Sequence, residues 1–186
     1  RDRFNIDYQG DYNVYLNDPR NINLGKKLIT NKKILIEKER LKEINETEYH
    51  EILINHTTPY SPFDILENKS LLLENNFDNL NAIDWDKGCY VGQEITARMK
   101  YRGLLKKKLY ALKIKSGDVL EGDELIVDNK KIGTIVSKAN SNIFAALNIN
   151  FVNEIKNKNQ NLVINDSLSF DFLNWKFFSI KTYWNY

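Results

Sequence analysis

The residues best suited to chemistry lie in one segment, 87–103, which reads KGCYVGQEITARMKYRG. It contains the only cysteine of the chain, Cys89, together with the only methionine and three of the eight glycines. Gly88 and Gly92 flank the cysteine, so the backbone there can turn tightly or let another group approach closely. This grouping predicts a reactive or ligand-facing thiol in a loop.

The residues that follow this loop predict a short helix over 94–99, whose first turn carries the acid Glu94. Cys89 then lies just before a helix N-terminus, where positive partial charge favours the thiolate over the thiol. Lys87 and Arg98 act in the same direction. The alternative is a structural role, because a single cysteine is most often a small buried hydrophobe. Composition by itself favours that alternative.

The elements that must position this segment begin upstream of it. Alternating apolar residues predict two strands within 4–16 and a short strand at 33–37, and a helical pattern runs over about 39–55. Two prolines make 56–64 irregular, and 65–86 reads as a connecting region. We therefore expect an α+β domain over residues 1–103.

Downstream of residue 104, short β-rich runs alternate with polar turns. Asp128-Asn129 predicts a tight hairpin between two of these runs. Strands at this spacing predict a small antiparallel β-barrel over 104–186, so the expected fold class is α+β. The predicted strands are 108–114, 123–127, 131–137, 143–149, 162–164, 168–173 and 175–183.

Composition excludes several classes of protein. With 27 basic and 25 acidic residues the net charge is +2, which argues against a dedicated nucleic-acid binder. One cysteine excludes an intramolecular disulfide framework and a Cys-rich zinc site. No apolar run approaches the ~20 residues of a membrane span, so no membrane partner is expected. Without a signal-peptide pattern, the predicted location is cytoplasmic.

The string KGCYVGQE at 87–94, followed by Ala97-Arg98 and by Gly103, resembles the signature of the YgfZ family. That family is related to the folate-binding T-protein, the aminomethyltransferase (GcvT) of the glycine cleavage system, and includes mitochondrial iron–sulfur assembly factors of the same type. Weaker similarity at Asp18-Pro19-Arg20 and in the β-rich region extends the resemblance over most of the chain. It implies a truncated GcvT/YgfZ-type α+β folate-binding domain followed by a small antiparallel β-barrel.

The resemblance also implies roles for individual residues. Cys89 would be the essential thiol, and the two flanking glycines would set its loop. Basic side chains near a helix N-terminus suit the carboxylates of a folate glutamate tail. The implied cofactor-binding residues for tetrahydrofolate are Lys87, Gly88, Tyr90, Gly92, Gln93, Glu94, Arg98 and Glu74.

The function that the resemblance implies is support of the assembly or repair of [4Fe–4S] clusters in client enzymes. The clients would include radical-SAM enzymes that modify tRNA, and the activity would depend on tetrahydrofolate. Independently of the family, one thiolate cannot hold a cluster by itself. We therefore expect no stably bound metal in this chain alone, and partners among iron–sulfur client enzymes or assembly proteins.

The chain departs from the family pattern in three respects. After the predicted helix it has INHTTP at 54–59, where the family usually has an arginine and a Gly-Ile-Pro turn. Before Glu74 it has leucines at 72 and 73, where the family usually has proline. The family's first domain, which contributes part of the folate cleft, would precede residue 1. We therefore expect residues 1–186 to bind folate poorly.

Two other functions stay open. An aminomethyltransferase would pass a one-carbon unit to tetrahydrofolate, but the T-protein carries the required acid in its N-terminal region, so an assembly factor is favoured over this enzyme. An RNA-binding module would use the basic patch at 98–108, where six basic residues and no acid occur. A solvated barrel edge or the rim of an anionic-ligand site is the favoured interpretation of that patch.

A metal site on the predicted helix is a weaker hypothesis. Glu46 and His50 are four residues apart and share a helical face, so they could chelate a metal. An ordinary helix surface is the favoured interpretation.

Overall fold

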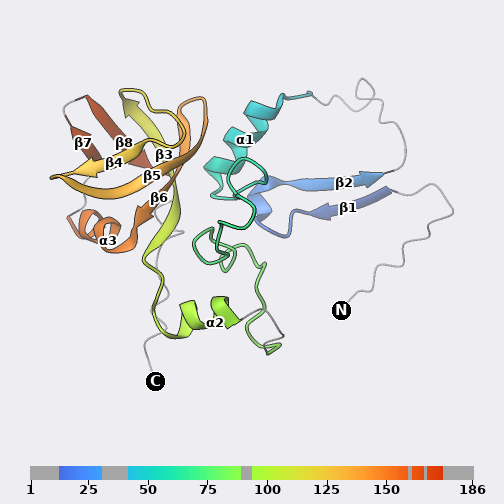
Figure 1. Ribbon diagram of the computed structural model, residues 1–186. Coiled ribbons are helices and arrows are strands. Elements are labelled where there is room, and N and C mark those ends of the chain that lie inside the picture. The colour runs from blue at the N-terminus through green and yellow to red at the C-terminus, as the bar shows by residue number, and fades with distance from the viewer. Residues whose placement is uncertain (1–12, 31–41, 89–93, 159–160, 166, 174–186) are drawn as a thin grey trace.

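A computed structural model of the chain describes residues 13–30, 42–88, 94–158, 161–165 and 167–173 (Figure 1). The first element is a hairpin of β1 (Asn13–Asn17) and β2 (Lys26–Thr30), joined through the short 3₁₀ helix η1 (Ile22–Leu24). Helix α1 (Glu46–Asn55) follows. A long, turn-rich connection then leads to α2 (Glu94–Tyr101), as was expected for 56–64 and 65–86.

The rest of the described chain is a six-stranded antiparallel sheet. The strand order is β4-β5-β6-β3-β8-β7, and the sheet curls so that its two edge strands, β4 and β7, come into contact. Helix α3 (Ile149–Asn157) lies beside the resulting barrel (Figure 1). The strands are β3 (Lys107–Ser116), β4 (Glu124–Val127), β5 (Lys130–Ala139), β6 (Asn142–Asn148), β7 (Leu162–Asn165) and β8 (Leu168–Phe172).

Strand β3 is buried on both of its faces. Tyr110 and Leu112 point into the barrel interior, where 14 buried side chains of the described residues form the main core. Leu109 and Ala111, one residue out of phase, point to the other face and pack against Ile54 at the end of α1. Helix α1 therefore covers the outer surface of β3, β5 and β6, and the core continues from the barrel to the upstream half of the chain.

The predicted α+β class and the antiparallel barrel are confirmed. The predicted hairpin at Asp128-Asn129 is confirmed as a two-residue turn with φ of 49° and 59°, the left-handed pair that matches the twist of the flanking strands. The GcvT/YgfZ-type assignment and the division into domains 1–103 and 104–186 stay predictions. The predicted strands at 33–37 and 175–183, and the first half of the 4–16 region, lie outside the described residues.

Two predicted boundaries are wrong. The helix expected from residue 39 begins only at Glu46, because Asn45 caps it: the Asn45 side chain accepts from the Glu48 amide, and the Glu48 side chain accepts from the Asn45 amide. The strand expected over 143–149 ends at Asn148, whose side chain caps α3 by accepting from the amides of residues 150 and 151. Apolar residues at 151, 152 and 155 were the signal for this missed helix.

The turn after α1 contains a strained residue. Thr57 has a φ of 52°, which is rare for a β-branched side chain, and it is fully buried. Its hydroxyl makes no hydrogen bond to any of the described residues. The turn thus combines backbone strain with an unpaired polar group.

We expect Thr57→Gly to raise the free energy of unfolding by about 1 kcal/mol, because glycine adopts this φ without strain and the unpaired hydroxyl is removed. Thr57→Val, which removes the hydroxyl and keeps the β-branch, is the matched control, since it separates the two causes. Urea denaturation of the three proteins measures the effect. A Thr57→Gly protein less stable than the wild type would show that the buried methyl group outweighs the strain.

Candidate functional site

The structure brings together residues that lie before and after the signature segment, 87–94. Trp85 lies just before this segment and α2 forms its far side. The Lys100 Nζ lies 3.6 Å from the centroid of the Trp85 ring, and the Tyr101 ring meets the same ring edge-on at 6.4 Å. Desolvation lowers the pKa of Lys100, against the smaller opposing effects of nearby carboxylates. A cation–π contact therefore anchors the end of α2 to the residue that leads into the segment.

Helix α2 confirms the helix predicted after the loop. It begins at Glu94, of which only the backbone is described, and it ends in a turn at Gly103 with a φ of 62°. The Leu104 amide donates to the Met99 carbonyl at 3.2 Å, the six-to-one hydrogen bond of a Schellman motif. Glycine is required at residue 103 because this motif needs a left-handed backbone.

The predicted site residues fall into two groups. Gly88 has a φ of 79°, a left-handed backbone conformation that glycine adopts without strain. Lys87 and Arg98 are exposed on the two sides of the segment. Four of the predicted residues, Cys89, Tyr90, Gly92 and Gln93, lie outside the described residues, so their roles stay predictions.

Glu74 lies at the start of the barrel. Its carboxylate is 3.4 Å from the Lys107 Nζ, and its carbonyl accepts from the Leu109 amide at 2.7 Å. Two residues on, the Asn76 side chain donates to the Leu109 carbonyl at 2.8 Å. These contacts hold the connecting region against the start of β3. Binding of folate by Glu74 stays a prediction.

Acidic side chains of the same chain neutralise part of the positive charge of the basic patch at 98–108. Lys107 pairs with Glu74, and the Lys108 Nζ lies 3.3 Å from the Asp78 carboxylate. Lys100 is held over the Trp85 ring. Lys100, Lys107 and Lys108 thus each have a contact within the chain.

A buried polar cluster that the sequence did not predict joins the upstream half of the chain to the barrel. Asp64 is 1% exposed and accepts a hydrogen bond from the Tyr60 amide at 2.7 Å. The His50 Nε2 lies 2.9 Å from its Oδ1, and the Ser137 hydroxyl donates to the same oxygen. A carboxylate only accepts, so the Nε2 of His50 carries the hydrogen in this contact.

The structure does not bring Glu46 and His50 together, and the favoured interpretation of an ordinary helix surface is wrong for His50, which is 6% exposed. His50 is buried against Asp64 and stacks on Phe63 with ring centroids 5.2 Å apart, whereas Glu46 is exposed. Within the described ranges, no three His, Cys, Asp or Glu side chains lie close enough to hold a metal ion. Nor does any helix of those ranges have the length and apolar character to cross a membrane.

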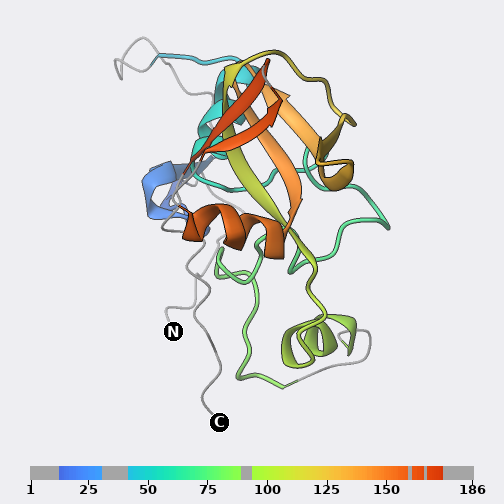
Figure 2. The ribbon, with the colours of Figure 1, turned by 90° about the vertical axis from the view of Figure 1, so that its left-hand side faces the viewer.

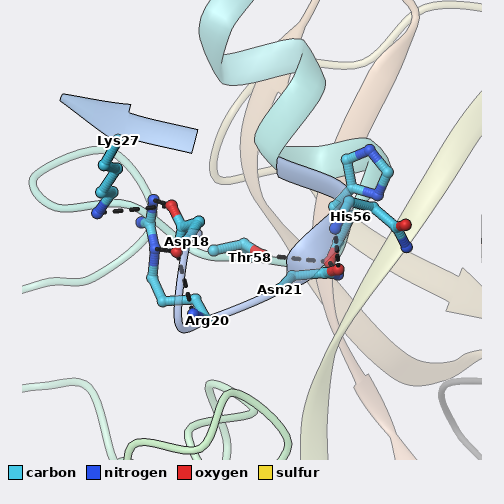
Figure 3. A network of polar contacts seen from close by, with 7 residues as sticks. Asp18, Arg20, Asn21, Lys27, His56 and Thr58 are labelled. Atoms are coloured by element: carbon cyan, nitrogen blue, oxygen red, sulfur yellow. Dashed lines mark hydrogen bonds and ion pairs between the residues drawn. The ribbon is translucent and has the colours of Figure 1, made fainter. Parts of the chain in front are cut away.

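A second polar network fixes the Asp18-Pro19-Arg20 turn (Figure 3). Asp18 is buried, and its two carboxylate oxygens accept from the Arg20 Nε at 3.0 Å and the Nη2 at 2.7 Å. Lys27 adds a third contact at 3.5 Å. The neighbouring Asn21 donates from its side chain to the His56 carbonyl at 3.3 Å, which ties the hairpin to the end of α1.

The contacts of Asp18 in this turn predict that the stability of the fold depends on pH. Hydrogen bonds from Arg20 lower the pKa of Asp18 to about 2. A carboxyl group whose pKa is lowered on folding stabilises the fold above its unfolded pKa of about 4, and that contribution is lost as the pH falls from about 4 to about 2. We expect Asp18→Asn to cost about 2 kcal/mol at pH 7 and little at pH 2. Denaturation at a series of pH values measures this, with the exposed Glu67→Gln as control; an equal cost at both pH values would contradict it.

Comparison with known proteins shows that the chain is similar in sequence to named proteins. No family model matches it. It is 35% identical over 121 residues to the mitochondrial iron–sulfur cluster assembly factor IBA57 homolog of Dictyostelium discoideum, an alignment that covers 61% of this chain and 30% of that protein. It is 30% identical over 103 residues to the mouse (Mus musculus) factor IBA57 and 30% identical over 102 residues to the human (Homo sapiens) one, covering 54% of this chain and 28% of each relative. The chain thus spans less than a third of the length of these relatives.

These relatives correct one prediction and confirm another in part. Each of them is named as a mitochondrial protein, so the predicted cytoplasmic location is wrong and the comparison points to the mitochondrion. The finer assignment to the folate-binding YgfZ type stays a prediction. At the level of the printed names, the expected resemblance is confirmed: the chain is similar in sequence to iron–sulfur cluster assembly factors.

Proposed function

We propose that the chain is the thiol-bearing part of a protein that supports the assembly or repair of [4Fe–4S] clusters in client enzymes. The observation that carries this proposal is the 121-residue similarity to a protein named as an iron–sulfur cluster assembly factor. The cluster is the cargo of this activity. Radical-SAM enzymes that modify tRNA are the client class that we propose.

The chemistry centres on Cys89. Cys89 precedes the first residue of α2 by five positions in the sequence. A thiolate near the positive end of a helix would be stabilised there, and it could bind iron or sulfur transiently. A cluster takes four ligands of this kind, and the chain has one cysteine. The remaining ligands come from outside these 186 residues, and we propose that a partner protein supplies them and shares the cluster while it is transferred.

Tetrahydrofolate is the proposed small-molecule ligand. Lys87 and Arg98 are exposed basic residues on either side of the signature segment, and such side chains suit the carboxylates of a glutamate tail. Gly88 keeps the backbone beside them free of a side chain. The proposed ligand would thus meet the protein at the same segment as the cluster.

The test is complementation in cells whose own assembly factor has been deleted. Expression of the complete protein is expected to restore the activity of mitochondrial [4Fe–4S] enzymes, with a [2Fe–2S] enzyme as the internal control. Failure to restore the [4Fe–4S] activities in cells that accumulate the folded protein would contradict the proposed function.

Titration of the complete protein with tetrahydrofolate tests the folate part separately. Saturable binding that Lys87→Glu with Arg98→Glu weakens is expected, since both variants repel a carboxylate tail. Absence of saturable binding would contradict the folate part and leave the cluster part standing.

A further inference from the structure

Trp85, Lys100 and Tyr101 contact one another across the signature segment. The Lys100 Nζ lies 3.6 Å from the centroid of the Trp85 ring and 5.5 Å from that of the Tyr101 ring. The two rings meet at an interplanar angle of 76°. Trp85 and Lys100 are both half-buried, and a cation–π contact is stronger when it is partly removed from water. We refer to these three residues as the α2 anchor.

Charge links the α2 anchor to the barrel. Both carboxylate oxygens of Asp78 lie 3.3 Å from the Nζ of Lys108, which is on β3. The carboxylates of Asp78 and Asp86 also act on Lys100, where they oppose the lowering of its pKa by desolvation. These acids favour the charged form of Lys100 that the contact with Trp85 requires. Asp78 thus interacts with a cation of the barrel and with the cation of the α2 anchor.

Helix α2 depends on contacts of this kind because it is short. Its eight residues are fewer than the ~12 that an isolated helix needs to be stable in water. Figures 1 and 2 show that it stands away from the barrel. Its last three residues are Met99, the most buried side chain described for this helix, and two members of the α2 anchor. The last turn therefore holds the helix in place, and the direction of its N-terminal end follows from that turn.

The α2 anchor also closes a loop that contains the thiol. Trp85 precedes Cys89 by four residues, and Lys100 follows it by 11. The contact thus brackets the whole signature segment within the 14 residues 86–99. A loop whose two ends are held together has fewer conformations available than one with free ends. The contact therefore restricts the arrangements that the thiol and the N-terminus of α2 can adopt.

We propose that Lys100 is a positioning residue that acts through Trp85 to hold the signature segment in the arrangement in which the Cys89 thiol reacts. This inference rests on the proposed function, in which that thiol binds iron or sulfur. Lys100 itself need not touch the cargo. The contact requires both the ammonium and the ring, so the loss of either partner should have the same effect on the thiol.

The test is the rate at which iodoacetamide alkylates Cys89 in the complete protein, measured over a range of pH. Trypsin cleaves after Lys87 and Arg98 and so releases residues 88–98 as one peptide, which contains Cys89 and none of the positions substituted below. Mass spectrometry of that peptide gives the alkylated fraction at each time and pH. The readout is therefore specific to this thiol. Far-UV circular dichroism establishes that the compared proteins are folded.

Lys100→Gln is expected to slow alkylation at neutral pH by about fivefold, the factor by which a cation–π contact of ordinary strength shifts an equilibrium. The midpoint of the pH profile should move to higher pH, because the positive end of α2 is no longer held near the thiol. Lys100→Arg should preserve the wild-type profile, since a guanidinium also stacks on tryptophan. The control is Lys106→Gln, which removes the charge of an exposed lysine just after α2. Equal profiles for Lys100→Gln and Lys106→Gln would overturn the proposal.

Trp85→Leu removes the ring and keeps the charge of Lys100. It should slow alkylation as much as Lys100→Gln does, and the double variant should be no slower than either single one. A wild-type rate in Trp85→Leu would show that the charge of Lys100 acts on the thiol directly and would overturn the proposal. Additive slowing in the double variant would overturn it as well, because the two residues would then act independently.

The alkylation rate is read without any client enzyme, so the two proposals can fail separately. Restored client activity with the same alkylation profile in all these variants would leave the proposed function standing and overturn the positioning role. A profile that depends on both Lys100 and Trp85, in a protein that restores no client, would support the positioning role and contradict the proposed function.

Discussion

Cys89→Ala is expected to abolish the support of [4Fe–4S] client enzymes while leaving the thermal midpoint of unfolding within a few degrees of the wild type. The substitution removes one sulfur atom, and no other thiol in the chain can replace it. A side chain that faces a ligand and lies outside the packed core contributes little to stability. Activity and stability should therefore separate.

The measurement is client activity in cells that lack their own assembly factor, combined with thermal denaturation of the purified variant. Cys89→Ser is the matched control, since it keeps the size of the side chain and replaces the sulfur by a poor iron ligand. It should fail as completely as Cys89→Ala. A variant that unfolds far more readily, yet keeps activity in its folded fraction, would show that Cys89 is structural.

The second large effect is on stability. Asp64→Ala is expected to lower the free energy of unfolding by about 3 kcal/mol, because it leaves three donors, two of them buried, without an acceptor. They are the Tyr60 amide, the His50 Nε2 and the Ser137 hydroxyl. The same change releases the 56–64 turn from the barrel.

Equilibrium urea denaturation measures this loss. Asp118→Ala is the control, because the exposed Asp118 pairs with Lys138 at the surface and its removal should leave the free energy nearly unchanged. Ser137→Ala in the Asp64→Ala background should cost less than Ser137→Ala alone, since the acceptor is already gone. Additive costs for the two substitutions would contradict a shared hydrogen bond.

Features that depend on neighbouring residues were predictable. The Asp128-Asn129 hairpin was found because a two-residue turn with two left-handed residues has a characteristic composition. The barrel strands were found from short apolar runs between polar turns. Helix α2 followed from the residues after the signature segment, and Gly103 ends it as a glycine in a left-handed turn should.

Helix boundaries were less predictable because capping depends on single side chains. Helical periodicity extended upstream of Glu46, but Asn45 and Glu48 satisfy each other's backbone amides and start the helix there. Asn148 has the same effect on α3, whose first residue, Ile149, falls within the strand predicted over 143–149. A single capping residue, Asn148, thus decides where the strand β6 ends and the helix α3 begins.

The sequence by itself determined the β-rich barrel, the short helix after the thiol segment and the resemblance to iron–sulfur assembly proteins, because each depends on residues that are contiguous in the chain. Only the tertiary structure decided which polar groups meet. Asp64 and Ser137 are 73 residues apart in the chain, and Glu74 and Lys107 pair across the connection to the barrel. Such pairs have no local signal, because their formation depends on how α1 and the connecting region pack against β3 and β5.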